Sequence, residues 1–507
     1  MKGPTAIIRT RGKVGIQAPP VTVEVHISNG LPSLSMVGLP ETAVKESKDR
    51  VRSAIVNSGF DFPRARITVN LAPADLPKEG GRYDLPIALG ILVASSQLDI
   101  AAIGDREFLG ELALTGGLRP IGGLLPAALA VAESGAELVV PRENAAEAAL
   151  SRQAKVIAAS TLMAVCEHLT GKVILPIEPT TSPSLETRPV DAFDLVDVVG
   201  QQMPRRALEV AAAGGHSMLF YGPPGSGKTM LASRLPSILP RLTESQALEV
   251  AAVHSISSGH LVRSDFWLPP FRAPHHTASG VALVGGGSRP RPGEISLAHH
   301  GVLFLDELPE YERKVLEVLR EPLESGTIAI SRAAQQVSFP ASFQLIAAMN
   351  PCPCGYFGDL QHDCHCNVES VRRYRSRISG PLLDRIDLHV EVKPVDKRCL
   401  IQRDTQNPEC SEVVRDRVLR ARQQQLDRQG CNNAQLTVSQ IGVHCQLGEA
   451  EKQLLDQAME RLKLSARAYH RVLKVARTLA DLSDVEILAG EHVLEAIGYR
   501  NFDRPLS

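Results

Sequence analysis

One stretch of the chain decides the fold, and it reads Ser217-Met218-Leu219-Phe220-Tyr221-Gly222-Pro223-Pro224-Gly225-Ser226-Gly227-Lys228-Thr229. Its opening run is largely apolar and predicts a buried strand, while residues 230–235 predict the start of a helix. A glycine-rich loop that ends in Gly-Lys-Thr between a strand and a helix is typical of a phosphate-binding P-loop. Its backbone N–H groups and the helix N-terminus both attract phosphate. We therefore expect an α/β core that binds a nucleotide.

The residues of this loop are expected to bind different parts of Mg²⁺-ATP. Lys228 would reach the β- and γ-phosphates, and the hydroxyl of Thr229 would hold Mg²⁺. The expected nucleotide-contacting residues are Gly222, Pro223, Pro224, Gly225, Ser226, Gly227, Lys228 and Thr229. The pattern predicts ATP and Mg²⁺ as cofactors.

Two later apolar runs end in polar residues. Residues 301–305 lead into Asp306 and Glu307, which is the pattern of a Walker B strand. Asp306 would orient Mg²⁺, and Glu307 would polarise the attacking water as the general base. Residues 343–349 lead into Asn350, whose amide can hold that water against the γ-phosphate. These residues complete an expected ATP-hydrolysing site.

The composition narrows the class of protein. A chain of 507 residues with 44% hydrophobic and 22% charged residues has room for about two to four globular domains. The formal net charge of −1 means that contacts with nucleic acid would come from local patches. No apolar run approaches the roughly 20 residues of a membrane helix, so we expect a cytoplasmic protein. In that compartment cysteines serve as metal ligands or free thiols.

The pattern changes along the chain predict three domains. Residues 1–172 alternate strand and helix signals and indicate a compact α/β domain, and residues 173–190 form a proline-rich linker. The P-loop core with its parallel sheet occupies residues 191–395. Residues 396–507 are helical and indicate a lid over the nucleotide, with helices expected at 411–429, 448–463, 465–482 and 487–498.

A cysteine-rich loop at 352–366 follows Asn350. Its two Cys-x-Cys pairs place four thiols close together, namely Cys352, Cys354, Cys364 and Cys366. Four thiolates can bind Zn²⁺ tetrahedrally, although reduced free thiols remain the alternative. Adjacent histidines at 275–276 and 299–300 also look like metal ligands, but we do not expect a metal there.

The N-terminal domain resembles the proteolytic domain of Lon at residues 110–123. That enzyme uses a Ser–Lys dyad, with the serine after a segment similar to residues 77–80 and the lysine after an Ile-Gly-Gly element. Residues 81–90 contain no serine, and residues 121–135 contain no lysine. The resemblance implies a Lon-like fold without protease activity, used for docking or for stabilising a ring.

Taken together, the Lon-like domain, the P-loop, the segments 352–359 (CPCGYFGD) and 372–387 (RRYRSRISGPLLDRID) and the helical lid closely resemble the YifB/ComM family. These are magnesium-chelatase-like AAA+ proteins of bacteria. The resemblance implies an arginine finger at Arg385, acting on the neighbouring subunit of a ring, which we expect to be a hexamer. It also implies a sensor 2 arginine at Arg467, with Arg477 as a competing candidate.

The family resemblance implies a motor that promotes DNA branch migration during recombination. In related helicases, the insertion at 266–300 and the hairpin expected at 326–342 face the ring pore. Arginines there that could contact DNA phosphates, or be solvated, are Arg289, Arg291 and Arg332. The basic run 372–377 could grip DNA, line a subunit interface or be solvated. The alternatives are an ATPase that remodels a protein complex, of chelatase or chaperone type, and a non-catalytic scaffold.

Overall fold

The computed structural model divides into two compact units. Unit 1 comprises Met1–Leu185 with Ala247–Phe266, and unit 2 comprises Glu186–Gln246 with Trp267–Ser507. The residues that the structure describes are 5–39, 41, 44, 46–180, 193–258, 266–287, 290–332, 335–359, 362–395, 409–462 and 464–500. Much of the expected linker 173–190 lies outside these ranges. Over the described ranges, no helix is long and apolar enough to cross a membrane.

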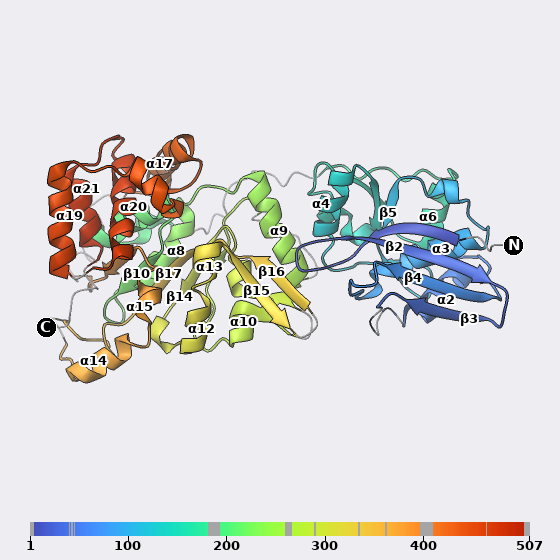
Figure 1. Ribbon diagram of the computed structural model, residues 1–507, viewed down its shortest axis with the longest axis horizontal. Coiled ribbons are helices and arrows are strands. Elements are labelled where there is room, and N and C mark those ends of the chain that lie inside the picture. The colour runs from blue at the N-terminus through green and yellow to red at the C-terminus, as the bar shows by residue number, and fades with distance from the viewer. Residues whose placement is uncertain are drawn as a thin grey trace. The chain divides into compact units, whose positions relative to one another are not determined.

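Unit 1 contains a mixed seven-stranded sheet in the order β3-β4-β2-β1-β5-β8-β9 (Figure 1). The pairs β1–β2 and β2–β4 are antiparallel and the remaining pairs are parallel. Alternate residues of β2 are buried, at Val21, Val23 and Val25, as its period-2 pattern predicts. The strands are β1 (Thr5–Arg11), β2 (Pro20–Ser28), β3 (Ser33–Val37), β4 (Arg66–Ala72), β5 (Arg106–Phe108), β8 (Glu137–Pro141) and β9 (Lys155–Ala159), beside a small pair β6 (Glu111–Leu112) and β7 (Leu118–Arg119).

One fully buried helix, α3 (Asp84–Ala94), packs on β1 and β2. A Cβ added at Gly90 would lie 2.6 Å from Cγ2 of Val25, so glycine lets this helix approach the sheet closely. The other helices are α2 (Ser47–Asn57), α4 (Leu125–Ser134), α5 (Ala145–Ala148) and α6 (Leu162–Leu169). Most of α9 (Glu244–Ser258) also groups with this unit, whereas the sequence pattern predicts a continuous ATPase core over residues 191–395.

Arg82 lies within residues 81–90, the segment in which the Lon resemblance would place the catalytic serine. Arg82 is buried and donates to the carbonyl oxygens of Gly12 (3.1 Å) and Gly122 (2.7 Å). Gly122 belongs to the Ile-Gly-Gly element. Burial lowers the pKa of Arg82. Arg82 therefore links the backbones at Gly12 and Gly122. Its guanidinium is not a nucleophile.

Unit 2 is built on a five-stranded sheet in the order β11-β14-β17-β10-β18, in which every pair is parallel. Figure 1 shows the central strands side by side. The strands are β10 (Met218–Tyr221), β11 (Phe271–Arg272), β14 (Val302–Leu305), β17 (Gln344–Met349) and β18 (Leu388–Glu391). β14 and β17 are buried along their whole lengths, which explains their continuous apolar runs. The polar residues after β10, β14 and β17 therefore meet at one edge of the sheet.

Short elements surround this sheet. The helices are α7 (Gln202–Gly214), α8 (Lys228–Ile238), α10 (Gly280–Val284), α11 (Glu294–Leu297), α12 (Arg313–Val318), α13 (Pro322–Ser325), α14 (Val368–Arg375) and α15 (Gly380–Leu383). A small pair joins β12 (Gly285–Gly286) and β13 (Arg291–Pro292). The hairpin expected at 326–342 is confirmed as β15 (Thr327–Arg332) and β16 (Gln335–Pro340), which pair antiparallel.

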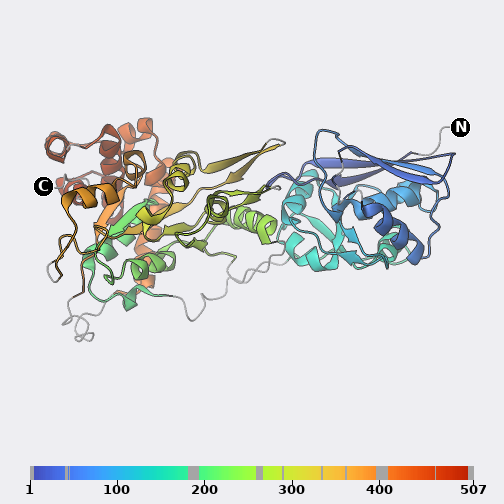
Figure 2. The ribbon, with the colours of Figure 1, turned by 90° about the horizontal axis from the view of Figure 1, so that it is seen from below.

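The chain after 409 is helical, as expected. The helices are α17 (Ser411–Gln429), α18 (Val438–His444), α19 (Glu449–Leu462), α20 (Ala466–Leu482) and α21 (Gly490–Gly498). They lie together in both ribbon views, in red (Figures 1 and 2). α17 and α20 pack against α7, and one hydrophobic core runs from β10 and β14 into α20 and α21. This core fixes the helical region to the nucleotide-binding sheet.

Candidate nucleotide site

The P-loop joins the end of β10 to the start of α8. Gly225 and Gly227 have φ values of +73° and +93°, in the left-handed region that favours glycine. A Cβ added at Gly222 would lie 2.1 Å from the carbonyl oxygen of Val392, so only glycine fits beside β18. The loop glycines are thus required by the backbone path.

Lys228 is the first residue of α8, and its side chain contacts the P-loop. Its Nζ donates to the carbonyl oxygens of Gly222 and Pro223, each at 2.8 Å, and to Oδ1 of Asn350 at 3.2 Å. Burial lowers the pKa of Lys228, while Asp306 and Glu307 oppose that shift. The structure therefore brings together the lysine and Asn350, which are far apart in the sequence.

Thr229, which follows the loop, contacts Asp306, which follows β14. The Thr229 hydroxyl donates to Oδ2 of Asp306 over 2.6 Å, and the N–H of Glu307 donates to Oδ1 of Asp306 over 2.9 Å. Hydroxyl and carboxylate oxygens are the hard ligands that Mg²⁺ prefers. These residues fit the Mg²⁺ site that the sequence indicated.

Glu307 has a partner that no local sequence pattern predicts. Its Oε2 lies 2.9 Å from Nδ1 of His276, and its backbone has a φ of +51°. The hydroxyl of Tyr311 donates to the carbonyl oxygen of Pro274 over 2.6 Å and anchors the segment that carries His276. His276 follows β11, the parallel neighbour of β14, so only the strand order could have pointed to it.

Arg385 lies in a buried position after α15. One guanidinium nitrogen contacts Oε1 of Glu324, and NH1 donates to the carbonyl oxygen of Pro381 over 2.7 Å. The side chain is only 6% exposed. Within this single chain the guanidinium is therefore engaged with α13 and α15.

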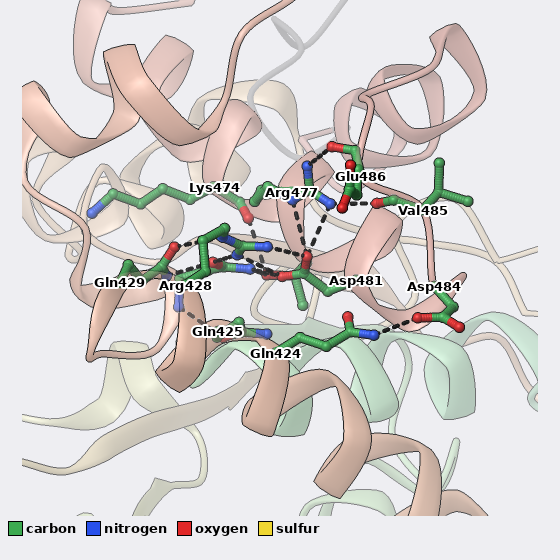
Figure 3. A network of polar contacts seen from close by, with 12 residues as sticks. Gln424, Gln425, Arg428, Gln429, Lys474, Arg477, Asp481, Asp484, Val485 and Glu486 are labelled. Carbon is green, nitrogen blue, oxygen red and sulfur yellow. Dashed lines mark hydrogen bonds and ion pairs between the residues drawn. The ribbon is translucent and has the colours of Figure 1, made fainter.

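The two candidate sensor 2 arginines occupy different surroundings. Arg467 is exposed in the first turn of α20, after the N-cap residue Ser465. Arg477 is buried, and its NH2 lies 2.9 Å from Oδ1 of Asp481 (Figure 3). NH1 and NH2 of Arg477 also donate to the carbonyl oxygens of Glu486 and Val485. Arg477 thus serves the internal packing of the helical region.

A second network joins the helical region to the sheet. Oδ2 of Asp387 lies 3.0 Å from Nδ1 of His216, and Oδ1 contacts Arg471 of α20. Nε2 of His216 lies 2.8 Å from the hydroxyl of Thr478. Burial raises the pKa of Asp387, but Arg471 and His216 outweigh it and hold that pKa below its usual range.

The four cysteines of the cysteine-rich loop converge. Their Sγ atoms all lie within 4.8 Å of one another, Cys352 is buried, and none forms a disulfide. Cys352 lies 3.3 Å from Cys354 and 3.7 Å from Cys364, and Cys354 lies 3.5 Å from Cys364. The N–H of Tyr356 lowers the pKa of Cys354 to about 6, and burial raises the pKa of Cys364 to about 12. The cluster has the donor set of a thiolate metal site.

Several of the expected basic residues are exposed. Arg372 and Arg373 are exposed on α14, and Arg291 is exposed on β13. Arg377 pairs with Glu310, with NH1 and Oε2 2.8 Å apart. Residue 289 and the side chain of Arg332 lie outside the described part of the chain.

Fold and site define a P-loop ATPase of the magnesium-chelatase-like AAA+ class. Family models described as magnesium chelatase subunit ChlI, subunit ChlI of Mg-chelatase and the ChlI C-terminal region match residues 194–400, 23–144 and 408–500. The chain belongs to the YifB/ComM family of this class.

Three relatives show how far the similarity extends. The competence protein ComM of Haemophilus influenzae is 50% identical over 503 residues, which cover 99% of this chain and 98% of that protein. YifB of Escherichia coli is 49% identical over 502 residues, with the same coverage. The magnesium-chelatase 38 kDa subunit of Rhodobacter capsulatus is 25% identical over 233 residues, 43% of this chain and 59% of that subunit.

Proposed function

We propose that the protein is an ATP-hydrolysing ring motor that acts on DNA and promotes branch migration of recombination intermediates. The observation that carries the proposal is the convergence of Lys228, Thr229, Asp306 and Asn350 at one edge of the sheet, with Glu307 next to Asp306. Similarity to a protein named for competence, over nearly the whole of both chains, supports DNA as the substrate.

Each residue of the site has a task in ATP hydrolysis. Lys228 would exchange its carbonyl contacts for β- and γ-phosphate oxygens. Glu307 would accept a proton from the attacking water, and Asn350 would hold that water in line. Mg²⁺ held by Thr229 and Asp306 would neutralise charge on the phosphates.

Two arginines outside the P-loop complete the proposed machinery. We assign the arginine finger to Arg385, which leaves Glu324 and reaches the γ-phosphate of the neighbouring subunit in a ring, with a hexamer as the expected size. We assign sensor 2 to Arg467, because its side chain is exposed. Arg477, in contrast, is buried and paired with Asp481. Both arginines would stabilise charge that develops in the transition state.

The exposed arginines of the core would bind DNA. Arg291, Arg372 and Arg373 are exposed and would contact phosphates without reading sequence. Arg289 and Arg332 are proposed for the same role from the sequence alone. Contacts of this kind weaken as salt concentration rises, because binding releases counterions.

Zinc is the metal that best fits the four cysteines. A tetrahedron of sulfurs around Zn²⁺ with Zn–S bonds near 2.3 Å has edges of roughly 3.8 Å. Three of the Sγ separations, 3.3, 3.5 and 3.7 Å, are close to that length. Four ligands from the protein close the coordination sphere, as in a structural zinc site.

A second candidate function is remodelling of a protein complex. The similarity to a magnesium-chelatase subunit over 233 residues favours it. Such a motor would be stimulated by a protein partner and would be indifferent to DNA.

Steady-state ATP hydrolysis separates the two candidates. The purified protein is assayed alone and with single-stranded, duplex and branched DNA, at low and moderate salt. We expect DNA to stimulate hydrolysis, more strongly at low salt, and Arg291→Gln to weaken that stimulation while exposed Arg420 in α17, changed to Gln, leaves it intact. Hydrolysis that no DNA changes would contradict the proposal and favour the protein-remodelling role.

A further inference from the structure

The cysteine-rich loop continues directly from the nucleotide site. β17 ends at Met349, whose carbonyl oxygen accepts from the N–H of Gly222 over 3.3 Å. Asn350 follows and contacts Lys228, and Cys352 stands two residues further along the chain. Any displacement of Cys352 is therefore transmitted to Asn350 through a single intervening residue, Pro351.

The loop also packs against the P-loop itself. Gly355 has a φ of +88°, and a Cβ added there would lie 2.7 Å from Cδ of Pro224. The N–H of Gly355 donates to the carbonyl oxygen of Cys352 over 3.0 Å. The turn held by Cys352 thus supports Pro224 from outside the phosphate-binding loop.

A single arginine joins these parts. Nε of Arg375 donates to the carbonyl oxygen of Pro351 over 3.3 Å, and its guanidinium lies 5.7 Å from the centre of the Phe357 ring. The N–H of Phe357 donates in turn to Sγ of Cys352 over 3.3 Å. Four thiolates outweigh the charge of one Zn²⁺, so the filled cluster is anionic and Arg375 lies where it can balance that charge.

The loop has few means of holding this shape without a metal. Residues 352–366 contain four cysteines, two glycines and two histidines, and few apolar side chains. A segment with so little apolar surface to bury gains its order from ligation.

We propose that zinc bound by Cys352, Cys354, Cys364 and Cys366 braces the nucleotide site, so that zinc occupancy sets the affinity for ATP. The proposal rests on the zinc assignment made above and is independent of DNA as the substrate. The metal fixes the turn at Gly355 against Pro224 and fixes Asn350 against Lys228. Loss of the metal frees both contacts and weakens nucleotide binding.

The first test uses the full-length protein. Its zinc content is measured by elemental analysis, and the affinity for a fluorescent ATP analogue is measured with Mg²⁺ held constant. The zinc is then removed with a chelator that spares Mg²⁺ and added back as Zn²⁺ alone. We expect one zinc per chain, an affinity about tenfold weaker after removal, and recovery on addition of Zn²⁺.

Two glycines of the loop offer a matched pair of variants. Gly358 has a φ of +80°, close to that of Gly355, but a Cβ added there would meet nothing within 4 Å. Gly355→Ala and Gly358→Ala therefore share the same backbone strain, and only the first presses on Pro224. We expect both variants to keep their zinc, and only Gly355→Ala to lose affinity for ATP.

The outcomes distinguish the zinc assignment from the proposed brace. Protein without zinc would overturn both the metal assignment and the brace. Zinc that can be removed without changing the affinity for ATP, or equal affinity in the two glycine variants, would overturn the brace alone. ATP hydrolysis that does not respond to DNA would leave the zinc assignment and the brace unaffected, because these measurements contain no DNA.

Discussion

Nδ1 of His276 lies 2.9 Å from Oε2 of Glu307, and this contact joins the segment after β11 to the end of β14. The residue proposed as the general base is thus held by the segment that follows the neighbouring strand. We expect that contact to open before Glu307 reaches the attacking water, which makes His276 a positioning residue for the base.

His276→Ala should release Glu307 and raise the basal rate of ATP hydrolysis. The pair is partly exposed, with 31% of the histidine and 50% of the glutamate side chain accessible. We therefore set its strength at about 1 kcal/mol, or roughly a fivefold increase in the basal rate. Steady-state hydrolysis without DNA measures it, and the factor by which DNA stimulates hydrolysis should fall in parallel.

The matched control is His275→Ala. His275 is the adjacent residue, but its Nδ1 lies 2.8 Å from the Thr277 hydroxyl, and it is exposed. It should behave as the wild type. A fall in the basal rate of His276→Ala would mean that His276 holds Glu307 in its working position instead of restraining it.

Arg385→Ala should bind ATP normally and lose hydrolysis by about 10²- to 10³-fold, the usual effect of removing a group that stabilises the transition state. Mixing Arg385→Ala subunits with Lys228→Ala subunits tests whether the arginine acts across an interface. A Lys228→Ala subunit would supply the intact arginine to an intact P-loop next to it, so activity should partly return. No recovery in mixtures that form rings would place Arg385 in its own subunit's site or in packing against Glu324.

Substitution of the two candidate sensor 2 arginines, Arg467 and Arg477, should have different effects. Arg467→Ala should keep the thermal stability of the protein and lose ATP hydrolysis about 10²-fold. Arg477→Ala should destabilise the helical region by on the order of 2 kcal/mol, because it leaves Asp481 with Arg428 as its remaining cation. Thermal unfolding and ATP hydrolysis of both variants separate these effects. Normal stability of Arg477→Ala combined with lost hydrolysis would reverse the assignment.

Stability should depend on pH through Asp387. Burial raises its pKa, but Arg471 and His216 bring that pKa below its usual range in the folded protein. Because the unfolded chain takes up the proton first, the stabilisation is complete above the ordinary aspartate pKa and is lost as pH falls below about 4. Asp387→Asn should cost on the order of 3 kcal/mol at neutral pH, since it leaves Arg471 without its carboxylate partner.

Melting temperatures at several pH values measure this dependence. Asp384→Asn is the control, because Asp384 lies three residues earlier in a half-buried position. The wild type and Asp384→Asn should lose stability below pH 4 more steeply than Asp387→Asn. Equal pH profiles for all three proteins would show that Asp387 contributes nothing to acid unfolding.

Local patterns in the sequence predicted the elements of unit 2 well. The helix expected at 411–429 is Ser411–Gln429, and the hairpin expected at 326–342 has both of its arms. Hydrophobic periodicity predicts these elements, and so do the turn residues between apolar runs. The meeting of Lys228 with Asn350 also followed from local reading, because polar residues after parallel strands share one edge of the sheet.

Contacts between distant segments could not be predicted in this way. His276 reaches Glu307 only because β11 pairs with β14, and a strand as short as Phe271–Arg272 leaves no periodic signal. The burial of Arg477 depends on the loop at 485–486 folding back over α20. The close packing of Gly355 on Pro224 likewise needs both loops in place.

The proposed motor function is tested most directly by ATP-dependent branch migration of a labelled synthetic junction. Gel electrophoresis follows the reaction, and the wild type and Glu307→Gln are compared side by side. Glu307→Gln should still bind ATP and DNA but lose turnover by about 10²- to 10⁴-fold. We expect the wild type to convert the junction only with hydrolysable ATP and Glu307→Gln to leave it unchanged. A wild type that hydrolyses ATP without moving the junction, or a Glu307→Gln protein that moves it at the wild-type rate, would contradict the proposed motor function.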